Sequence, residues 1–238
     1  MDNLKGTRHV LTAEDEQYPS SLKELCSPPE QLHVIGNPAA LRPGIAIVGS
    51  RLASPYGRTC ARQFARIAAE HRIPVVSGGA RGIDTAAHRA ALEAGGPTVA
   101  VLGSGCDAIY PAENSGLFQQ IVESGGSVVS EYDWQRAPRP YQFRVRNRIV
   151  AGLARAVLVV EAGLPSGTFS IADEALALNR CVLAVPGPIT SQYSKGSNYL
   201  IRQGATPIID DETFFDALRS LGMTRPDRET PSGQGIEN

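Results

Sequence analysis

The sequence predicts an α/β domain built on a doubly wound, mostly parallel sheet with helices on both faces. Short apolar runs rich in β-branched residues alternate with segments of helical pattern from Ile45 onward, as in βαβ units. Most of these runs are continuously apolar, which is typical of strands covered by helices on both sides. The length of 238 residues suits one large domain with appendages or two small domains. Together these observations favour one domain.

The apolar runs predict seven strands, each followed by one candidate helix. The strands are expected at residues 45–48, 74–76, 98–102, 127–129, 156–160, 182–185 and 206–209. The helices are expected near residues 57–71, 84–94, 114–124, 146–153, 168–179, 196–203 and 211–221. The segments between strands are short enough for right-handed crossovers. We therefore expect the main domain to span residues 45–222.

The two ends of the chain differ from this domain. Residues 1–44 contain Tyr18-Pro19, Pro28-Pro29 and a short apolar run at 32–35, so we expect a small lead-in segment that packs on the domain edge. Residues 223–238 are polar, with Pro, Gly and Ser, and are expected to be disordered.

Cysteine spacing and hydropathy exclude several classes of protein. The four cysteines show no CxxC spacing, which argues against a zinc ribbon or a disulfide framework, so we expect them to be reduced and mostly buried. No apolar run approaches the roughly 18 residues of a membrane span, and residues 1–10 lack the apolar stretch of a signal peptide. A cytoplasmic location and no membrane partner are therefore expected. The cysteines are Cys26, Cys60, Cys106 and Cys181.

Taken as a total, the formal net charge of -1 argues against a partner as acidic as nucleic acid. The total, however, is a cancellation between segments. Residues 1–44 carry four basic and six acidic groups, residues 45–205 carry sixteen and eleven, and residues 206–238 carry three and seven. The central segment is therefore basic.

Arginine dominates the positive charge. It outnumbers lysine twenty to three, and residues 134–160 contain six arginines and no acid. A guanidinium group is planar, forms paired hydrogen bonds with phosphate and stacks on bases. The arginines therefore indicate phosphate contacts, with a solvated arginine face as the alternative.

Glycines and small hydroxyl residues follow most of the predicted strands. In open α/β sheets ligands bind outside the carboxyl ends of the strands. Glycine lets a ligand approach the backbone, and N–H groups at helix N-termini bind anions. The sequence therefore predicts a phosphate-binding groove at this rim. The segments are Gly49-Ser50-Arg51, Ser77-Gly78-Gly79, Gly103-Ser104-Gly105, Ser130-Glu131, Glu161 with Ser166-Gly167-Thr168, and Pro186-Gly187.

Known cofactor motifs do not fit this rim. No lysine follows glycine with the spacing of a P-loop. Residues 103–108 match G-x-G-x-x-A after a strand, but Tyr110-Pro111 interrupts the place where a dinucleotide-binding helix begins. We therefore expect no ATP, NAD or FAD cofactor.

Catalytic constellations are equally weak. Asp84 and His88 lie one helical turn apart, and Glu131 and Glu161 end two strands, but one histidine with scattered acids does not make a metal site. The alternative role for Asp84 is a helix cap or a group that supports the site without contacting a ligand. No G-x-S-x-G elbow is present for a serine nucleophile. We therefore predict no catalytic residue and no metal site.

The arginine cluster follows the fourth predicted strand and opens a helix. This position places the aromatic residue and the arginines of Phe143-Arg144-Val145-Arg146-Asn147-Arg148 at the same rim as the glycines. Single-stranded nucleic acid is bound by a basic groove with an aromatic platform for base stacking. The alternative for Phe143 is an ordinary core position. Arg51 and Lys195, which precedes Gly196-Ser197-Asn198, extend the basic rim.

An ordered series of these motifs resembles the DNA-processing protein A family, also called DprA or Smf. The resemblance covers about residues 18 to 209. The matching motifs are Tyr18-Pro19, Pro28-Pro29 to Gly36, Ala46-Ile47-Val48-Gly49-Ser50-Arg51, Tyr56-Gly57, Ser77-Gly78-Gly79-Ala80, Gly82-Ile83-Asp84, Ala87-His88, Val101-Leu102-Gly103-Ser104-Gly105, Tyr110-Pro111, Ser130-Glu131, Arg146-Asn147-Arg148, Ser166-Gly167-Thr168, Pro186-Gly187, and Gly196-Ser197-Asn198 through Leu200-Ile201 to Gly204-Ala205.

The resemblance implies an extended Rossmann-like domain that dimerises and binds single-stranded DNA in a positive pocket. It also implies contact with the RecA recombinase, whose loading on DNA such mediators help, in natural transformation or recombination. Arg51, Arg146 and Arg148 match phosphate ligands, and Phe143 matches a base-stacking aromatic. The DNA-binding residues expected from the rim and the resemblance together are Gly49, Ser50, Arg51, Ser77, Gly78, Gly79, Gly103, Gly105, Phe143, Arg144, Arg146, Asn147, Arg148, Ser166, Gly167, Thr168, Lys195 and Asn198.

The sequence also departs from the family pattern. Arg144 stands where the family usually has proline, and residues 1–17 and 223–238 do not resemble the helical and winged-helix-like domains of longer members. Two alternatives stay open. One is a nucleotide-binding sensor or a nucleoside-monophosphate phosphoribohydrolase-like enzyme. Such an enzyme would use Glu131 or Glu161, although 164–168 lacks the double glycine of those enzymes. An interaction scaffold would bind RecA without DNA.

Overall fold

A computed structural model describes residues 3–164 and 166–224, and in these residues nine strands form one sheet. The strand order is β1-β2-β6-β5-β4-β3-β7-β8-β9, with parallel pairing from β6 to β9 and antiparallel pairing of β1, β2 and β6. This confirms the doubly wound, mostly parallel fold. The strands are β1 (Arg8–Thr12), β2 (Gln31–Gly36), β3 (Gly44–Val48), β4 (Val75–Ser77), β5 (Thr98–Val101), β6 (Ser127–Ser130), β7 (Ala154–Val159), β8 (Cys181–Ala184) and β9 (Thr206–Pro207).

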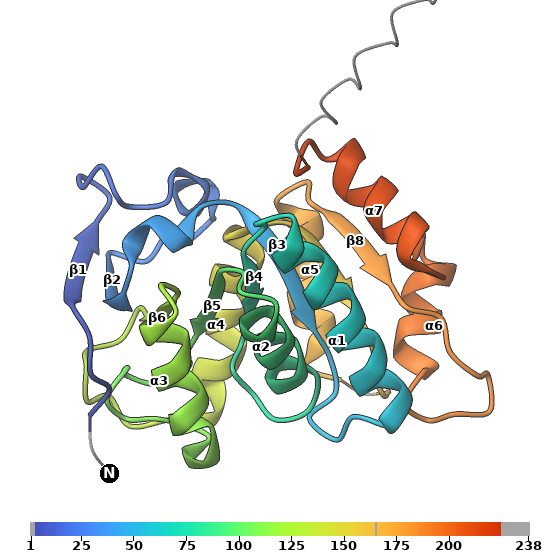
Figure 1. Cartoon of the computed structure of the whole chain (residues 1–238), viewed down its shortest axis with the longest axis horizontal. Helices are drawn as coiled ribbons and strands as arrows, with labels where there is room; N and C mark the ends of the chain where they lie inside the picture. The colour runs from blue at the N-terminus through green and yellow to red at the C-terminus, as the bar shows by residue number, and fades with distance from the viewer. Residues whose placement is uncertain (1–2, 165, 225–238) are drawn as a thin grey trace, which may run out of the picture.

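Helices cover both faces of the sheet (Figure 1). Helices α1, α2 and α7 pack on one face against Ile45 and Ile47 of β3, whereas α4, α5 and α6 pack on the other against Ala46 and Val48. Alternate residues of β3 therefore point to opposite, buried faces, which explains why this strand is apolar throughout. The helices are α1 (Pro55–Glu70), α2 (Ile83–Glu93), α3 (Ser115–Glu123), α4 (Pro140–Gly152), α5 (Thr168–Ala177), α6 (Lys195–Arg202) and α7 (Asp211–Ser220).

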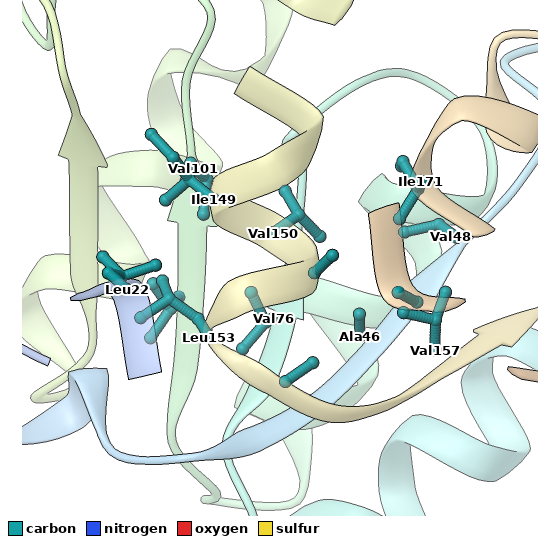
Figure 2. Packing of buried hydrophobic residues seen from close by; sticks show 14 of the residues in the cluster. Leu22, Ala46, Val48, Val76, Val101, Ile149, Val150, Leu153, Val157 and Ile171 are labelled. Carbon is teal, nitrogen blue, oxygen red and sulfur yellow. The ribbon is translucent and has the colours of Figure 1, made fainter. Parts of the chain in front are cut away.

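The core beneath α4 links the sheet to the lead-in segment. Ile149, Val150 and Leu153 lie against sheet residues, and Leu22, from the 3-10 helix Ser20–Glu24, joins the same cluster (Figure 2). A side chain on Gly152 would overlap Leu22, so this glycine allows the lead-in to sit directly on α4. The position of α4, which carries the arginine cluster, is therefore held from both sides.

The lead-in contributes two strands that the sequence did not predict. β1 and β2 pair antiparallel, with Arg8 opposite Ile35, and β2 continues the sheet beyond β6, with His33 opposite Ser130. An ion pair of 2.9 Å between Arg8 and Asp107 adds a further link. The run at 32–35 precedes the alternation of apolar runs and helical segments on which the strand predictions rest, so the pattern did not identify it as a strand.

Other boundaries and burial also differ from expectation. α4 begins at Pro140, six residues before the expected start, because proline is favoured in the first turn of a helix. Cys60 and Cys106 are buried, but Cys26 and Cys181 are exposed, so the prediction of mostly buried cysteines is wrong for these two.

Two further observations complete the description of the fold. Met223 packs against the core beside α7, whereas most of the tail predicted to be disordered lies outside the described residues. Among the helices of the described part, none has both the length and the apolarity required to cross a membrane.

Candidate nucleic-acid interface

The strand order reverses between β3 and β7, and a cavity of about 430 Å³ lies at their carboxyl ends. Such a switch point is where open α/β sheets bind ligands. We call this space the central cavity. It brings together many of the predicted site residues, namely Gly49, Ser50, Arg51, Phe143, Arg144, Arg146, Asn147, Ser166, Gly167 and Thr168.

Two arginines of the central cavity carry uncompensated charge. Arg51 follows β3 and Arg144 lies in the second turn of α4, and both are exposed. Neither side chain forms a hydrogen bond or ion pair with any other described residue. Asp84 is the acidic residue that lines the cavity, and it is buried in the wall. The accessible charge at the cavity mouth is therefore positive, which favours an anionic ligand.

Arg146 is different from these two, because only 4% of it is exposed. Its guanidinium donates a hydrogen bond to the carbonyl of Val101 and lies against Gly78, where a side chain would overlap it. Burial lowers the pKa of Arg146 to about 10, partly offset by the attraction of Asp84, so the group stays charged at neutral pH. Arg146 therefore places a fixed positive charge in the wall of the central cavity.

Asp84 holds the loop between β4 and α2. Its carboxylate accepts hydrogen bonds from the backbone N–H groups of Gly78 and Ala80, at 3.1 and 3.2 Å. Burial raises the pKa of this carboxyl group, and the charge of Arg146 opposes the shift. The geometry matches the alternative role of a group that supports the site.

His88 does not share the central cavity with Asp84. The ring is completely buried in α2, and its Nδ1 atom lies 2.7 Å from the hydroxyl of Thr98. Burial lowers the pKa of His88 to about 3, so the ring is neutral at physiological pH. A neutral, enclosed imidazole of this kind contributes to packing.

The N-terminus of α5 forms the opposite wall of the central cavity. Space around Gly167 is open, and the backbone N–H of Thr168 is held by the hydroxyl of Ser166 at 3.1 Å. Asn147 of α4 donates to the hydroxyl of Ser170 at 2.7 Å, which ties the two helices together. The positive end of the helix dipole makes this terminus suitable for phosphate.

Phe143 lies at the rim with its ring partly covered. The ring rests against Gly103, and the guanidinium carbon of Arg51 lies 5.5 Å from its centroid. Tyr110 approaches it with a centroid distance of 5.2 Å. These side chains also line a small crevice of about 20 Å³ together with Arg81. Tyr110 and Arg81 were not predicted as site residues, although the Tyr-Pro motif after the third predicted strand was a usable signal.

Several predicted residues do not line the central cavity. The hydroxyl of Ser77 donates to the carbonyl of Ile47, and Gly79 lies against Phe118. Gly105 donates its N–H to the carbonyl of Arg136, in the loop before α4. These residues support the rim from behind, as Gly78 and Gly103 do by leaving room for Arg146 and Phe143.

The rim near α6 also has a structural role. Asn198 bonds to the N–H and the carbonyl of Gly187, at 3.1 and 2.9 Å. Lys195 is exposed at the start of α6, outside the lining of the central cavity. Lys195 therefore does not add its charge to the lining of the central cavity, as the sequence had led us to expect.

Arg148 lies on the other side of α4. It forms two hydrogen bonds with Glu131, at 2.7 and 2.6 Å, and a third with the carbonyl of Ser27 at 2.9 Å. Residues two positions apart in a helix point to nearly opposite sides, because each residue turns the helix by about 100°. The prediction that Arg148 shares the glycine rim with Arg146 is therefore wrong in its geometry.

Comparison with known proteins agrees with this architecture. The family model for DNA recombination-mediator protein A matches residues 9–219. Protein Smf from Escherichia coli (strain K12) is 41% identical over 212 residues, which cover 89% of this chain and 57% of the relative. The chain thus spans little more than half the length of that protein.

Two solved structures are also similar. DNA processing protein A from Streptococcus pneumoniae superposes with a TM-score of 0.82 at 38% identity, covering 88% of this chain and 74% of the other. The protein from Helicobacter pylori, which was described for its single-stranded DNA binding mode, gives 0.82 at 29% identity, covering 92% and 99%. From the family match over most of its length, the chain belongs to the DNA recombination-mediator protein A family.

Proposed function

We propose that this chain binds single-stranded DNA in the central cavity and helps to load a RecA recombinase on that strand. One observation carries the DNA-binding part. The guanidinium groups of Arg51 and Arg144, which pair with no acid among the described residues, line a switch-point cavity that also contains the N-terminus of α5. This arrangement offers phosphate both exposed cations and the positive end of a helix dipole.

The aromatic rim favours a single strand over a duplex. Phe143 and Tyr110 lie beside the cationic groups, where bases of a flexible strand can reach them. In a duplex the bases are stacked and paired, so their faces are not available to such side chains. The relative from Helicobacter pylori supports this choice of ligand.

The mediator role rests on family membership. A protein that holds the backbone of a strand can present it to a recombinase, and the family description names recombination mediation. We extend this to a homodimer that contacts RecA in the cytoplasm and acts in natural transformation or recombination. The expected outcome is faster assembly of RecA on single-stranded DNA when this protein is present, measured by a labelled strand that lengthens as RecA coats it.

The carboxylates that an enzyme would use are engaged elsewhere. Glu131 is paired with Arg148, and Glu161 accepts a hydrogen bond of 2.9 Å from the backbone N–H of Ser54 at the start of α1. These contacts favour DNA binding over base release from a nucleoside monophosphate.

The DNA-binding part is tested by fluorescence anisotropy with a labelled thymidylate oligomer. Arg51→Ala is expected to weaken binding several-fold and to reduce the dependence of log Kd on log salt by about 0.7 for each lost phosphate contact. Arg89→Ala is the matched control, because Arg89 is exposed on α2, away from the central cavity. Equal effects of the two substitutions, or no binding by the unmodified protein, would reject the proposal.

A further inference from the structure

The guanidinium group of Arg51 lies over the ring of Phe143 at the rim. Its backbone is fixed, because Ser50 donates to the carbonyl of Glu161 at 2.8 Å, but the guanidinium forms no hydrogen bond or ion pair within residues 3–164 and 166–224. What it does contact is the ring of Phe143, at 5.5 Å from the centroid. A cation over an aromatic ring at an exposed site is bound weakly.

The ring of Phe143 has limited free surface. One part rests on Gly103, where a side chain would come within 2.8 Å of the ring, and Tyr110 packs at a tilt of 56°. Arg51 and Phe143 line both the central cavity and the small crevice. The crevice of about 20 Å³ has room for one water but not for a base. A base that reaches Phe143 from the central cavity therefore competes with the guanidinium for the same ring.

We propose that the Arg51 guanidinium and a nucleobase exchange on the ring of Phe143. When a strand enters the central cavity, the guanidinium leaves the ring to pair with a phosphate, and the vacated surface accepts a base. This inference rests on the proposed function and adds a specificity device to it. Phosphate capture and base stacking become coupled, so a ligand that offers only phosphates loses the ring contact without replacing it.

The exchange predicts opposite effects of one substitution on two ligands. Phe143→Leu removes the aromatic face, so a thymidylate oligomer loses stacking, which is worth roughly 5- to 150-fold in affinity per base. The same substitution releases Arg51 in the free protein. An abasic oligomer of the same length is therefore expected to bind about 2- to 5-fold more tightly to the variant than to the unmodified protein.

The experiment measures both oligomers by anisotropy against the unmodified protein, Phe143→Leu and Phe143→Met. Methionine fills the space of the ring with a flexible apolar chain that lacks a π face, so it serves as the second variant if leucine disturbs the fold. Tyr141→Leu is the aromatic control, because Tyr141 lies exposed on the same helix without lining the central cavity or the crevice.

The exchange is supported if both Phe143 variants weaken thymidylate binding and tighten abasic binding, with Tyr141→Leu changing neither. Equal weakening of both oligomers would show that the ring only supports Arg51 and would overturn the exchange while leaving DNA binding intact. Unchanged abasic affinity would also overturn it. If the unmodified protein binds neither oligomer, the proposed function itself fails.

Discussion

The cavities on the two sides of α4 differ in how far their arginines are neutralised by acidic residues. On one side, the central cavity of about 430 Å³ is lined by Arg51, Arg144 and Arg146 against the single buried acid Asp84. On the other, a cavity of about 440 Å³ beside the lead-in segment is lined by Arg136 and Arg148 together with the acids Glu30, Glu131 and Asp133.

The two cavities have nearly the same volume but differ in net charge. Arg148 and Glu131 neutralise each other at 2.6 Å, and their side chains are only 12% and 13% exposed. Volume therefore does not identify the nucleic-acid site in this molecule. What distinguishes the central cavity is the positive charge of Arg51 and Arg144, with which no carboxylate of residues 3–164 and 166–224 forms an ion pair.

The strongest test of this comparison removes the buried charge. Arg146→Met is expected to lower the free energy of unfolding by about 3–5 kcal/mol, because it leaves the buried Asp84 without its cationic neighbour and the carbonyl of Val101 without a donor. Urea denaturation measures the change. A loss below about 1 kcal/mol would show that the buried arginine contributes little to the fold.

The next test uses the pH dependence of stability to probe a buried histidine outside the central cavity. The pKa of His88 is about 3 in the folded protein, against 6.5 for an ordinary histidine. Between these two values the unfolded chain binds a proton at His88 and the folded protein does not. The contribution of neutral His88 to the free energy of unfolding is fully present above pH 6.5 and is lost progressively towards pH 3. The loss is about 2 kcal/mol between pH 7 and pH 5.

Burial also lowers the pKa of His33, which adds to the loss in the same direction. The measurement is the urea midpoint at several pH values, with His88→Gln as the variant. This variant is expected to flatten the pH dependence between pH 7 and pH 5. An unchanged slope would assign the pH dependence to other groups.

A smaller effect is expected where glycine makes room for the rim. In Gly103→Ala the new methyl group meets the ring of Phe143 at 2.8 Å, so the ring has to shift, at a cost of about 1–2 kcal/mol. Gly167→Ala meets open space and is the control for stability. Thermal unfolding of the two variants compares them, and equal melting temperatures would contradict the packing role of Gly103.

The last pair of substitutions distinguishes the two sides of α4 directly. Arg144→Gln is expected to weaken binding of single-stranded DNA by a few-fold, to reduce the salt dependence and to leave stability within about 0.5 kcal/mol. Arg148→Gln is expected to lower stability by about 1–2 kcal/mol, since it leaves Glu131 partly buried and unpaired, while the salt dependence of binding stays unchanged. Reversal of these two patterns would refute the assignment of the sides.

Much of the fold was predictable because each βα unit has its own local sequence pattern. The run Gly44–Val48 is apolar on both faces and is followed by a helix with Ser54 as its cap, and both features are visible as sequence patterns. The two lead-in strands were not predictable, because β2 becomes a strand by pairing with β6, more than 90 residues away in the chain.

The candidate site divides in the same way. The glycine and hydroxyl residues at the ends of β3 and β7 were predicted to meet because carboxyl ends of parallel strands share one edge, and they do meet in the central cavity. The roles of Gly78 and Gly103 were misread, since a glycine that admits a ligand and one that admits a protein side chain look alike in sequence.

By itself, the sequence determined the alternation of strands and helices, the basic middle of the chain and the rim at which its glycines gather. Strand and helix patterns and charge are read directly from the sequence, and the carboxyl ends of parallel strands share one edge of the sheet. Only the tertiary structure decided which arginines are free. Arg144 has no acidic partner in the described part of the chain, Arg146 is buried beside Asp84, and Arg148 is paired with Glu131. The reason is physical: the charge that a side chain offers to a ligand depends on burial and on partners that the fold brings from distant segments.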